Sequence, residues 1–183
     1  SDRMGIQSLI EAAGLSERRM TSTTVAFGIC PRINAAGRMG SADRAIRLLL
    51  SEDYEEANAL AQEINDENAT RQQTEQEILN QAVAQIKNNL NWIYQNVLVV
   101  AGEGWHDGVV GIVASRLVEK YGKPTLVITV DGDDAKGSGR SIDGFNLYDA
   151  LSHCGECLTH FGGHMLAAGI GLKTENIGTF RKT

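Results

Sequence analysis

The sequence lacks any apolar run that approaches the ~20 residues of a membrane-spanning helix, and its start lacks a signal-peptide pattern. It has only three cysteines, and this odd number argues against the disulfide framework of a secreted protein and favours a reducing cytoplasm. It also lacks an initiator methionine in first place and a natural stop signal, so we expect a piece of a longer chain. Its 183 residues, 42% of them hydrophobic, are still enough to bury a core.

Metal-binding motifs are also missing. In the second half of the chain the one Asp-x-Asp is Asp131-Gly132-Asp133, and there is no His-His or His-Glu-x-x-His arrangement. Asp131, Asp133 and Asp134 fit a solvated turn better than a metal site. Phosphodiester hydrolysis is hard to build without a metal or a general acid–base pair. We therefore expect no catalytic residue and no bound metal in this chain.

One Cys-x-x-Cys pattern is open to two interpretations. Cys154 and Cys157, flanked by His153 and His160, have a spacing that zinc sites use. The same two cysteines end a helical pattern, where free cysteines behave as small hydrophobic residues. We favour the hydrophobic role over zinc binding.

The net charge of −6 is concentrated in one segment. Nine of the 23 acidic residues lie in Glu52–Glu77, together with one of the 17 basic residues, Arg71. The rest of the chain therefore has 16 basic and 14 acidic residues. Because the local potential governs anion binding, the overall acidity does not exclude a nucleic-acid partner.

The first half of the chain predicts helices around one strand. Met4–Ala13 has an apolar helical face that Gly14 ends, and Ser41 can cap a further helix. Thr23–Ile29 is β-branched and apolar, which predicts a strand. Pro31–Gly40 is predicted to be irregular.

A long helix is predicted from about Tyr54 to about Leu90. Its two ends are apolar, but between Ile64 and Ile78 the only apolar residue is Ala69. At ~1.5 Å per residue this polar middle runs about 20 Å. Such a helix usually bridges two bodies across solvent, and the alternative is a helix that lies on one domain with a wet central face.

After Asn96 strands and helices alternate. Strands are predicted at 97–101, 125–130, 135–142 and 165–172, with helices at 109–121 and 146–154. The predicted fold class is therefore α/β: an N-terminal helical part with a long connector helix, then a mixed, mainly parallel sheet flanked by helices.

Four clusters combine glycine with cationic or hydroxyl side chains: Arg32–Arg38, Gly104–Gly111, Gly137–Ser141 and Phe161–His164. Small residues let a backbone approach a ligand closely, and guanidinium groups match phosphate oxygens in pairs. This combination favours a phosphate ligand.

The first two clusters each have a purely structural alternative. Arg32 and Arg38 flank small residues and Asn34, which also fits a basic loop in which Asn34 satisfies a turn. His106 precedes a helix start, where free N–H groups bind anions. The alternative there is a tight turn whose Trp105 packs in the core.

The third cluster places two hydroxyls and a guanidinium within five residues. On a strand, Ser138 and Arg140 would share one face and Ser141 would lie opposite, with the Gly139 backbone between them. This set suits a sugar–phosphate backbone. The alternative is an edge strand that carries polar residues.

The fourth cluster is Gly162-Gly163-His164. Two glycines before a histidine suggest a sharp bend that presents the imidazole, and these glycines serve no evident packing purpose in the sequence. A lone histidine is more often structural, so the glycines carry the functional interpretation.

In this order, the four clusters resemble the RecJ family of the DHH phosphoesterase superfamily. Pro31–Met39 resembles the stretch that follows the DHH domain of that family. Trp105–Leu117, Gly137–Ser141 and Phe161–Gly169 resemble its DHH-associated domain. The resemblance covers nearly the whole chain, and Pro31–Met39 makes it specific for RecJ.

The resemblance implies a single-stranded-DNA-specific 5′→3′ exonuclease of DNA repair and recombination, which uses Mn²⁺ or Mg²⁺ bound by a preceding DHH domain. Neither that domain nor a following OB-fold domain is in the sequence. The chain alone is therefore expected to be inactive, with single-stranded DNA and the missing catalytic domain as its partners in the cytoplasm.

The resemblance also implies domain limits and contact residues. Residues 1–52 would end the catalytic region and carry an inter-domain motif, 53–92 would be the connector helix, and 93–183 a substrate-binding domain truncated at its C-terminus. The expected phosphate-binding residues are Arg32, Asn34, Arg38, His106, Ser138, Gly139, Arg140, Ser141, Gly162, Gly163 and His164.

Two alternatives from other functional classes are open. The first is a DHH phosphodiesterase of short oligonucleotides or cyclic dinucleotides, which shares the glycine–histidine motif. The second is a non-enzymatic nucleic-acid-binding module, as in tRNA-editing proteins that carry a related domain. Preference for long single strands excludes the first, and nuclease activity of the full-length protein excludes the second.

Overall fold

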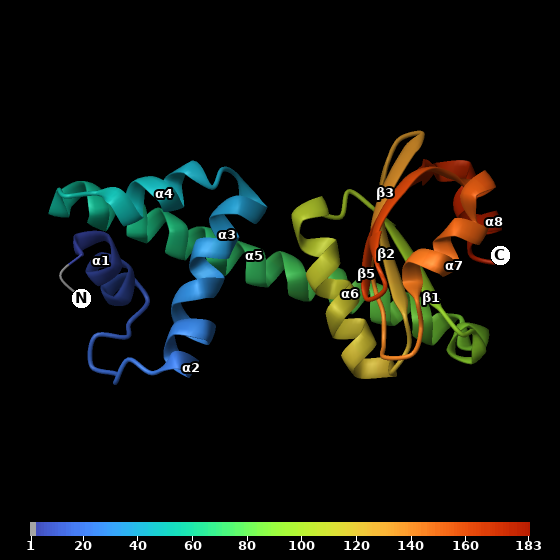
Figure 1. Cartoon of the computed structure of the whole chain (residues 1–183), viewed down its shortest axis with the longest axis horizontal. Coiled ribbons are helices and arrows are strands. Elements are labelled where there is room, and N and C mark those ends of the chain that lie inside the picture. Colours follow the sequence, from blue (N-terminus) through green and yellow to red (C-terminus); the bar gives the residue numbers. More distant parts are fainter. Residues whose placement is uncertain (1–2) are drawn as a thin grey trace. The chain divides into compact units, whose positions relative to one another are not determined.

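A computed structural model describes residues 3–183 and divides the chain into two compact units (Figure 1). The first unit extends to Gln73, and the second runs from Thr74 to Thr183. The long helix α5 (Tyr54–Asn88) contributes residues to both units. Among the described residues, no helix combines the length and the apolar character that crossing a membrane requires.

The first unit is built of helices around one apolar core. Its elements are α1 (Met4–Ala12), α2 (Ser22–Thr24), a π-helix (Val25–Ile29), α3 (Cys30–Met39), α4 (Asp43–Leu50) and the first part of α5. The core residues are Leu9, Leu15, Ile29, Ala36, Ala45, Leu48, Ala57, Leu60, Ala61 and Ile64. The predicted helix at Met4–Ala13 is confirmed, and the Asp43 N–H donates to Ser41 Oγ (3.1 Å) ahead of α4.

Two predictions in this unit are wrong. Thr23–Ile29 is helical rather than a strand, because Thr21 Oγ1 caps α2 by accepting from the Thr24 N–H (3.1 Å). Pro31–Gly40 is not irregular: Pro31 stands in the first turn of α3, directly after the π-helix, and the φ that its ring fixes is a helical one. The burial of Ala35 and Ala36 on α3 then outweighs the strand propensity of the residues before it.

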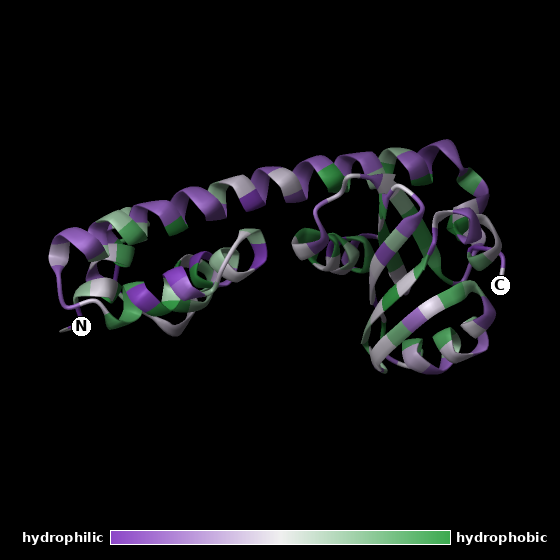
Figure 2. Cartoon of the chain, turned by 90° about the horizontal axis from the view of Figure 1, so that it is seen from above, coloured by the Kyte–Doolittle hydropathy of each residue, from purple (hydrophilic) through white to green (hydrophobic). Residues whose placement is uncertain are grey.

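Helix α5 has the predicted length, 35 residues from Tyr54 to Asn88. Figure 2 shows hydrophilic residues along much of it. The boundary between the two units, after Gln73, falls in the polar stretch between Ile64 and Ile78. That the helix acts as a connector between two domains stays a prediction.

The second unit contains a five-stranded sheet in the order β1-β2-β3-β5-β4. The strands are β1 (Leu98–Glu103), β2 (Thr125–Asp131), β3 (Asp134–Arg140), β4 (Leu158–His164) and β5 (Ala167–Lys173). The helices are α6 (Asp107–Tyr121), α7 (Leu147–His153) and α8 (Ile177–Phe180), with 3-10 turns at Leu90–Tyr94, Gly155–Cys157 and Thr174–Asn176.

The α/β class and the mixed sheet flanked by helices are confirmed, but the sheet is not mainly parallel. In residues 3–183, β1–β2 is the one parallel pair among four. The physical reason is that β2–β3 and β5–β4 are joined by tight turns, which only antiparallel neighbours allow. Strand β4 was not predicted, because Phe161–His164 is rich in glycine and lacks the alternation that marks a strand.

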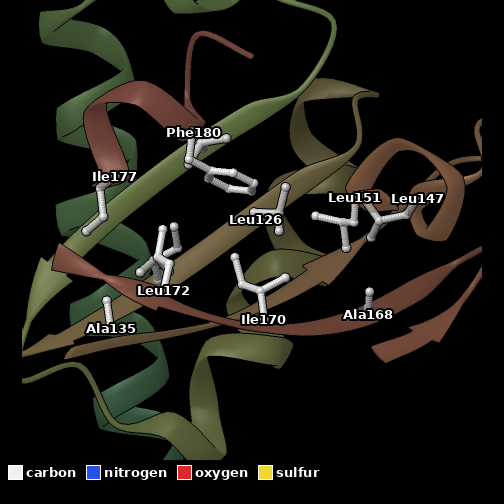
Figure 3. Packing of buried hydrophobic residues seen from close by; sticks show 11 residues of the cluster. Leu126, Ala135, Leu147, Leu151, Ala168, Ile170, Leu172, Ile177 and Phe180 are labelled. Atoms are coloured by element: carbon white, nitrogen blue, oxygen red, sulfur yellow. The ribbon is translucent and has the colours of Figure 1, made fainter. Parts of the chain in front are cut away.

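The two faces of the sheet have different chemistry. On one face, residues of β2, β3 and β5 pack against α7 and α8 (Figure 3). The buried cluster is Val99, Leu126, Ile128, Ala135, Leu147, Leu151, Ala168, Ile170, Leu172, Ile177 and Phe180. On the opposite face α6 packs on β2 and β3. That second face carries the polar side chains of β3 and β4.

Candidate nucleic-acid interface

The strand register brings the third and fourth clusters together on the face that α6 partly covers. Ser138 of β3 is paired with Gly169 of β5, which is paired with Gly162 of β4. In the next row, Arg140 is paired with Ala167, and Ala167 with His164. Directly opposed residues of neighbouring strands share a face, so two motifs more than 20 residues apart form one surface.

The floor of this surface is open backbone. Gly162 and Gly169 are exposed, a Cβ atom at Gly162 would meet nothing within 4 Å, and one at Gly169 would meet only Gly137 O at 4.0 Å. The packing of this chain therefore does not require glycine at either position. Two adjacent strands without side chains instead allow a ligand backbone to approach the sheet closely.

The neighbouring glycines have a different role. Gly163 has φ +150°, and a Cβ atom there would lie 2.3 Å from Ala167 O. A Cβ atom at Gly139 would lie 2.7 Å from Leu147 Cδ2 on the apolar face. The sequence interpretation that both glycines of β4 lack a packing purpose holds for Gly162 and fails for Gly163, and the chain continues as a strand rather than bending sharply there.

Arg140 is half-buried and held in place by its own strand and by α6. Its Nη1 donates to Ser138 Oγ (3.0 Å) and to Gly139 O (2.7 Å). A Cβ atom at Gly111 of α6 would lie 3.0 Å from both Arg140 Nη2 and Ser138 Oγ. The second cluster therefore contacts the third through Gly111. This role was not predicted, although a glycine inside a helix is a sequence signal for close packing against a neighbouring group.

His164 is exposed at the end of β4, and the Leu166 N–H donates to its Nδ1 (3.2 Å). This bond requires a lone pair on Nδ1, so the proton of the neutral imidazole is on Nε2. The Nε2–H group is then a donor for an anion on the surface.

Two further predicted residues have partners within the chain. His106 is the N-cap of α6, where its Nδ1 accepts from the Gly108 N–H (3.1 Å). Ser141 follows β3, and its hydroxyl donates to Phe145 O (2.8 Å). Both contacts order the backbone beside the polar face. The bond of Ser141 uses its hydroxyl hydrogen, whereas the bond to His106 Nδ1 leaves the Nε2–H of that ring as a donor, as in His164.

The predicted residues of the first unit lie on α3. Arg32 Nε donates to Asn65 Oδ1 (3.0 Å) and its Nη1 to Gly28 O (2.6 Å), and partial burial lowers the pKa of its guanidinium. Asn34 and Arg38 are four residues apart, so they share one exposed face of the helix. Within this unit Arg32 is therefore bonded to its own helical neighbourhood, whereas Asn34 and Arg38 lie on an exposed helix face.

The structure supports structural roles for Trp105 and the cysteine pair. Trp105 is 5% exposed, and its Nε1 donates to Gln81 Oε1 (2.8 Å). Cys154 and Cys157 pack against the apolar cluster, and the Cys154 thiol donates to Ala150 O (3.5 Å). Burial, followed by the nearby Cys157, raises the pKa of Cys154, which favours the neutral thiol.

Divalent metal binding does not fit the residues present. Within residues 3–183 no group of three or more His, Cys, Asp or Glu side chains has the arrangement that could hold a metal ion. The polar face offers a guanidinium, a hydroxyl, an imidazole and open backbone, which are groups of the kind that contact phosphate oxygens in proteins and which supply no general base pair.

Comparison with known proteins agrees with this chemistry. The DHHA1 domain family matches residues 89–183. The single-stranded-DNA-specific exonuclease RecJ of Bacillus subtilis (strain 168) is 43% identical over 183 residues, which is 99% of this chain and 23% of the relative. Two solved structures of RecJ from Thermus thermophilus cover 100% of this chain, one in complex with Mn²⁺ (TM-score 0.86, 35% identity, 26% of that chain) and one with Mg²⁺ (TM-score 0.82, 34% identity, 28% of that chain). This chain spans about a quarter of the length of these relatives.

Proposed function

Because the chain belongs to the DHHA1 domain family and matches RecJ exonucleases over its whole length, we propose that it is the substrate-holding part of a cytoplasmic single-stranded-DNA-specific 5′→3′ exonuclease of DNA repair and recombination. The relatives are RecJ enzymes, and their solved structures contain Mn²⁺ or Mg²⁺. Hydrolysis would then take place on a metal-binding part of the longer protein.

The observation that supports this proposal is the polar face built by Ser138, Arg140, Gly162, Gly169 and His164. Its donors are one guanidinium, one hydroxyl and one imidazole N–H, and its floor lets a phosphate approach the backbone. Donors of this kind contact phosphate and sugar, which are the same in every sequence. The face therefore suits an enzyme that holds a strand without reading its bases.

Each donor would act on the phosphate in a defined way. The Arg140 guanidinium is fixed by Ser138 and Gly139 O, so little side-chain freedom is lost when it binds an oxygen. The His164 Nε2–H donates from the opposite side of the glycine floor. We propose that Asn34 and Arg38, on the exposed face of α3, contact another part of the strand.

The experiment is a titration of this chain with a single-stranded oligothymidylate and a cyclic dinucleotide at low and moderate salt. We expect weak strand binding whose logarithm falls with the logarithm of salt by about 0.7 per phosphate contacted. Arg140→Gln should abolish it, with Lys182→Gln, which removes an exposed charge elsewhere, as the matched control. Preferential binding of the cyclic dinucleotide would instead support the phosphodiesterase alternative.

A cleavage assay completes the test. The chain with Mn²⁺ should leave a 5′-labelled single strand intact, and the full-length protein should degrade it. Metal-dependent cleavage by the chain alone would refute the proposal that this chain only holds the strand and that a separate metal-binding part hydrolyses it. A full-length protein that is inactive with either metal would refute the exonuclease assignment and favour a binding module.

A further inference from the structure

The polar face continues for one more row beyond Ser138 and Arg140. Lys136 of β3 is paired with Gly171 of β5, and Gly171 is paired with His160 of β4. Lys136, Ser138 and Arg140 alternate along β3, so all three side chains lie on the same face. None of the four glycine-containing clusters in the sequence includes Lys136 or His160.

The side chain of His160 lies over Gly171. A Cβ atom at Gly171 would be 2.1 Å from His160 Cε1 and 2.6 Å from Nδ1, so the imidazole occupies the space that a side chain on β5 would fill. Since Gly171 stands between β4 and β3, the ring leans from β4 toward Lys136. Thr159 Oγ1 lies 3.2 Å from His160 Nδ1, which leaves Nε2 for another partner.

Lys136 supplies a positive charge at the other end of this row. It is exposed, and no hydrogen bond or ion pair within residues 3–183 occupies its ammonium group. The carboxylates that line the same pocket as Lys136 are Asp131 and Asp134 at the β2–β3 turn and Asp107 at the start of α6. Of these, Asp134 is already paired with Lys173 (Nζ–Oδ1 2.6 Å). The row that contains Asp134 therefore marks the end of the cationic surface along β3.

The spacing of the rows matches the ligand. Alternate residues of a strand are about 6.6 Å apart, a span comparable to that between successive phosphates of an extended single strand. Ser138 and Arg140 are bonded to each other and act as one subsite, and Lys136 stands one such step beyond Ser138. Two neighbouring phosphates can thus be contacted at once.

We propose that Lys136 and His160 form a second phosphate subsite, which binds the phosphate next to the one held by Ser138, Arg140 and His164. This inference rests on the proposed function, because it takes a single-stranded backbone as the ligand. It makes the second unit a two-phosphate grip that ends at the Asp134–Lys173 pair.

The test compares thymidine 5′-monophosphate, which has one phosphate, with the dinucleotide pTpT and the trinucleotide pTpTpT on the 183-residue chain. Affinity should rise from the mononucleotide to the dinucleotide and change little beyond it. Lys136→Gln and His160→Gln should each weaken the dinucleotide roughly threefold to fivefold and leave the mononucleotide unchanged. Lys182→Gln should change neither.

The outcomes separate the two proposals. If Arg140→Gln abolishes binding of every ligand while Lys136→Gln leaves the dinucleotide-to-mononucleotide ratio unchanged, the second subsite is wrong and the proposed function stands. The second subsite is also wrong if Lys182→Gln weakens dinucleotide binding as much as Lys136→Gln does, because the loss would then reflect the net charge of the protein and not a local contact. If none of the three ligands binds and Arg140→Gln has no effect on a longer strand, the proposed function fails as well.

Discussion

Replacing the two neighbouring glycines of β4 one at a time should separate binding from folding. Gly162 and Gly163 are adjacent in sequence, and successive residues of a strand point to opposite faces. A methyl group at position 162 would project into open space on the polar face, with no atom within 4 Å. A methyl group at position 163 would lie 2.3 Å from Ala167 O and 2.5 Å from Ala168 Cα, at a φ of +150°.

These contacts set the magnitudes. Gly162→Ala should change the free energy of unfolding by less than about 1 kcal/mol and in the stabilising direction, because alanine loses less backbone entropy on folding. Gly163→Ala combines a strained backbone with two overlaps that only a shift of the β4–β5 pairing relieves, so it should cost about 3 kcal/mol or more. At about 4 °C per kcal/mol, the unfolding temperature of the second unit should fall by about 12 °C.

The assay is thermal unfolding by circular dichroism, followed by fluorescence anisotropy with a labelled oligothymidylate at a temperature where both variants are folded. Gly162→Ala should bind about tenfold more weakly, equivalent to about 1.4 kcal/mol, because the methyl group lifts the phosphate off the glycine floor. Wild-type binding by a folded Gly162→Ala protein would refute the interface. Equal stability of the two variants would refute the β4–β5 geometry.

Three further changes test individual contacts. Gly111→Ala places a methyl group 3.0 Å from the Arg140 guanidinium, so the affinity for a single strand should fall several-fold while the circular dichroism spectrum stays unchanged. Unaltered affinity would show that α6 does not position Arg140. Ser141→Ala removes the hydrogen bond to Phe145 O, so it should lower the free energy of unfolding in urea by about 1 kcal/mol and leave the affinity for a single strand unchanged. A loss of affinity without a loss of stability would make Ser141 a direct contact. Burial raises the pKa of Cys154, so its thiolate forms only at higher pH. At about pH 8 iodoacetamide should therefore modify Cys154 more slowly than the exposed Cys30, as measured by mass spectrometry. Equal rates would contradict the burial of Cys154.

Several elements could be predicted because their signals are local. The first helix, the long α5 and the β1–α6–β2 unit follow from hydrophobic period and from terminal residues that lie within a few positions of each element. Asn146, for example, caps α7 by accepting from the Asp149 N–H (3.3 Å), and Gly122 ends α6 with φ +64°. Such interactions need no knowledge of the rest of the fold.

The wrong predictions share one physical cause, which is competition between local preference and distant packing. The β-branched run Thr23–Ile29 prefers a strand, but a cap at Thr21 and the helix that follows place it in a helical segment. Strand β4 has almost no strand propensity in Phe161–His164 and exists because β5 pairs with it along most of its length. Alternating strands and helices likewise predict a mainly parallel sheet, but the tight turn between β2 and β3 makes these two strands antiparallel.

For the candidate site, the sequence by itself determined which residue types gather in four motifs, and these types are the basis on which a phosphate ligand is proposed. Only the tertiary structure decided what each residue does within its motif. The register of β3, β5 and β4 puts Ser138, Arg140, Gly162 and His164 on one face, whereas Gly139 and Gly163 serve packing on the other. The physical reason is that the side chains of a strand alternate between faces, and which face is open depends on helices that are distant in sequence.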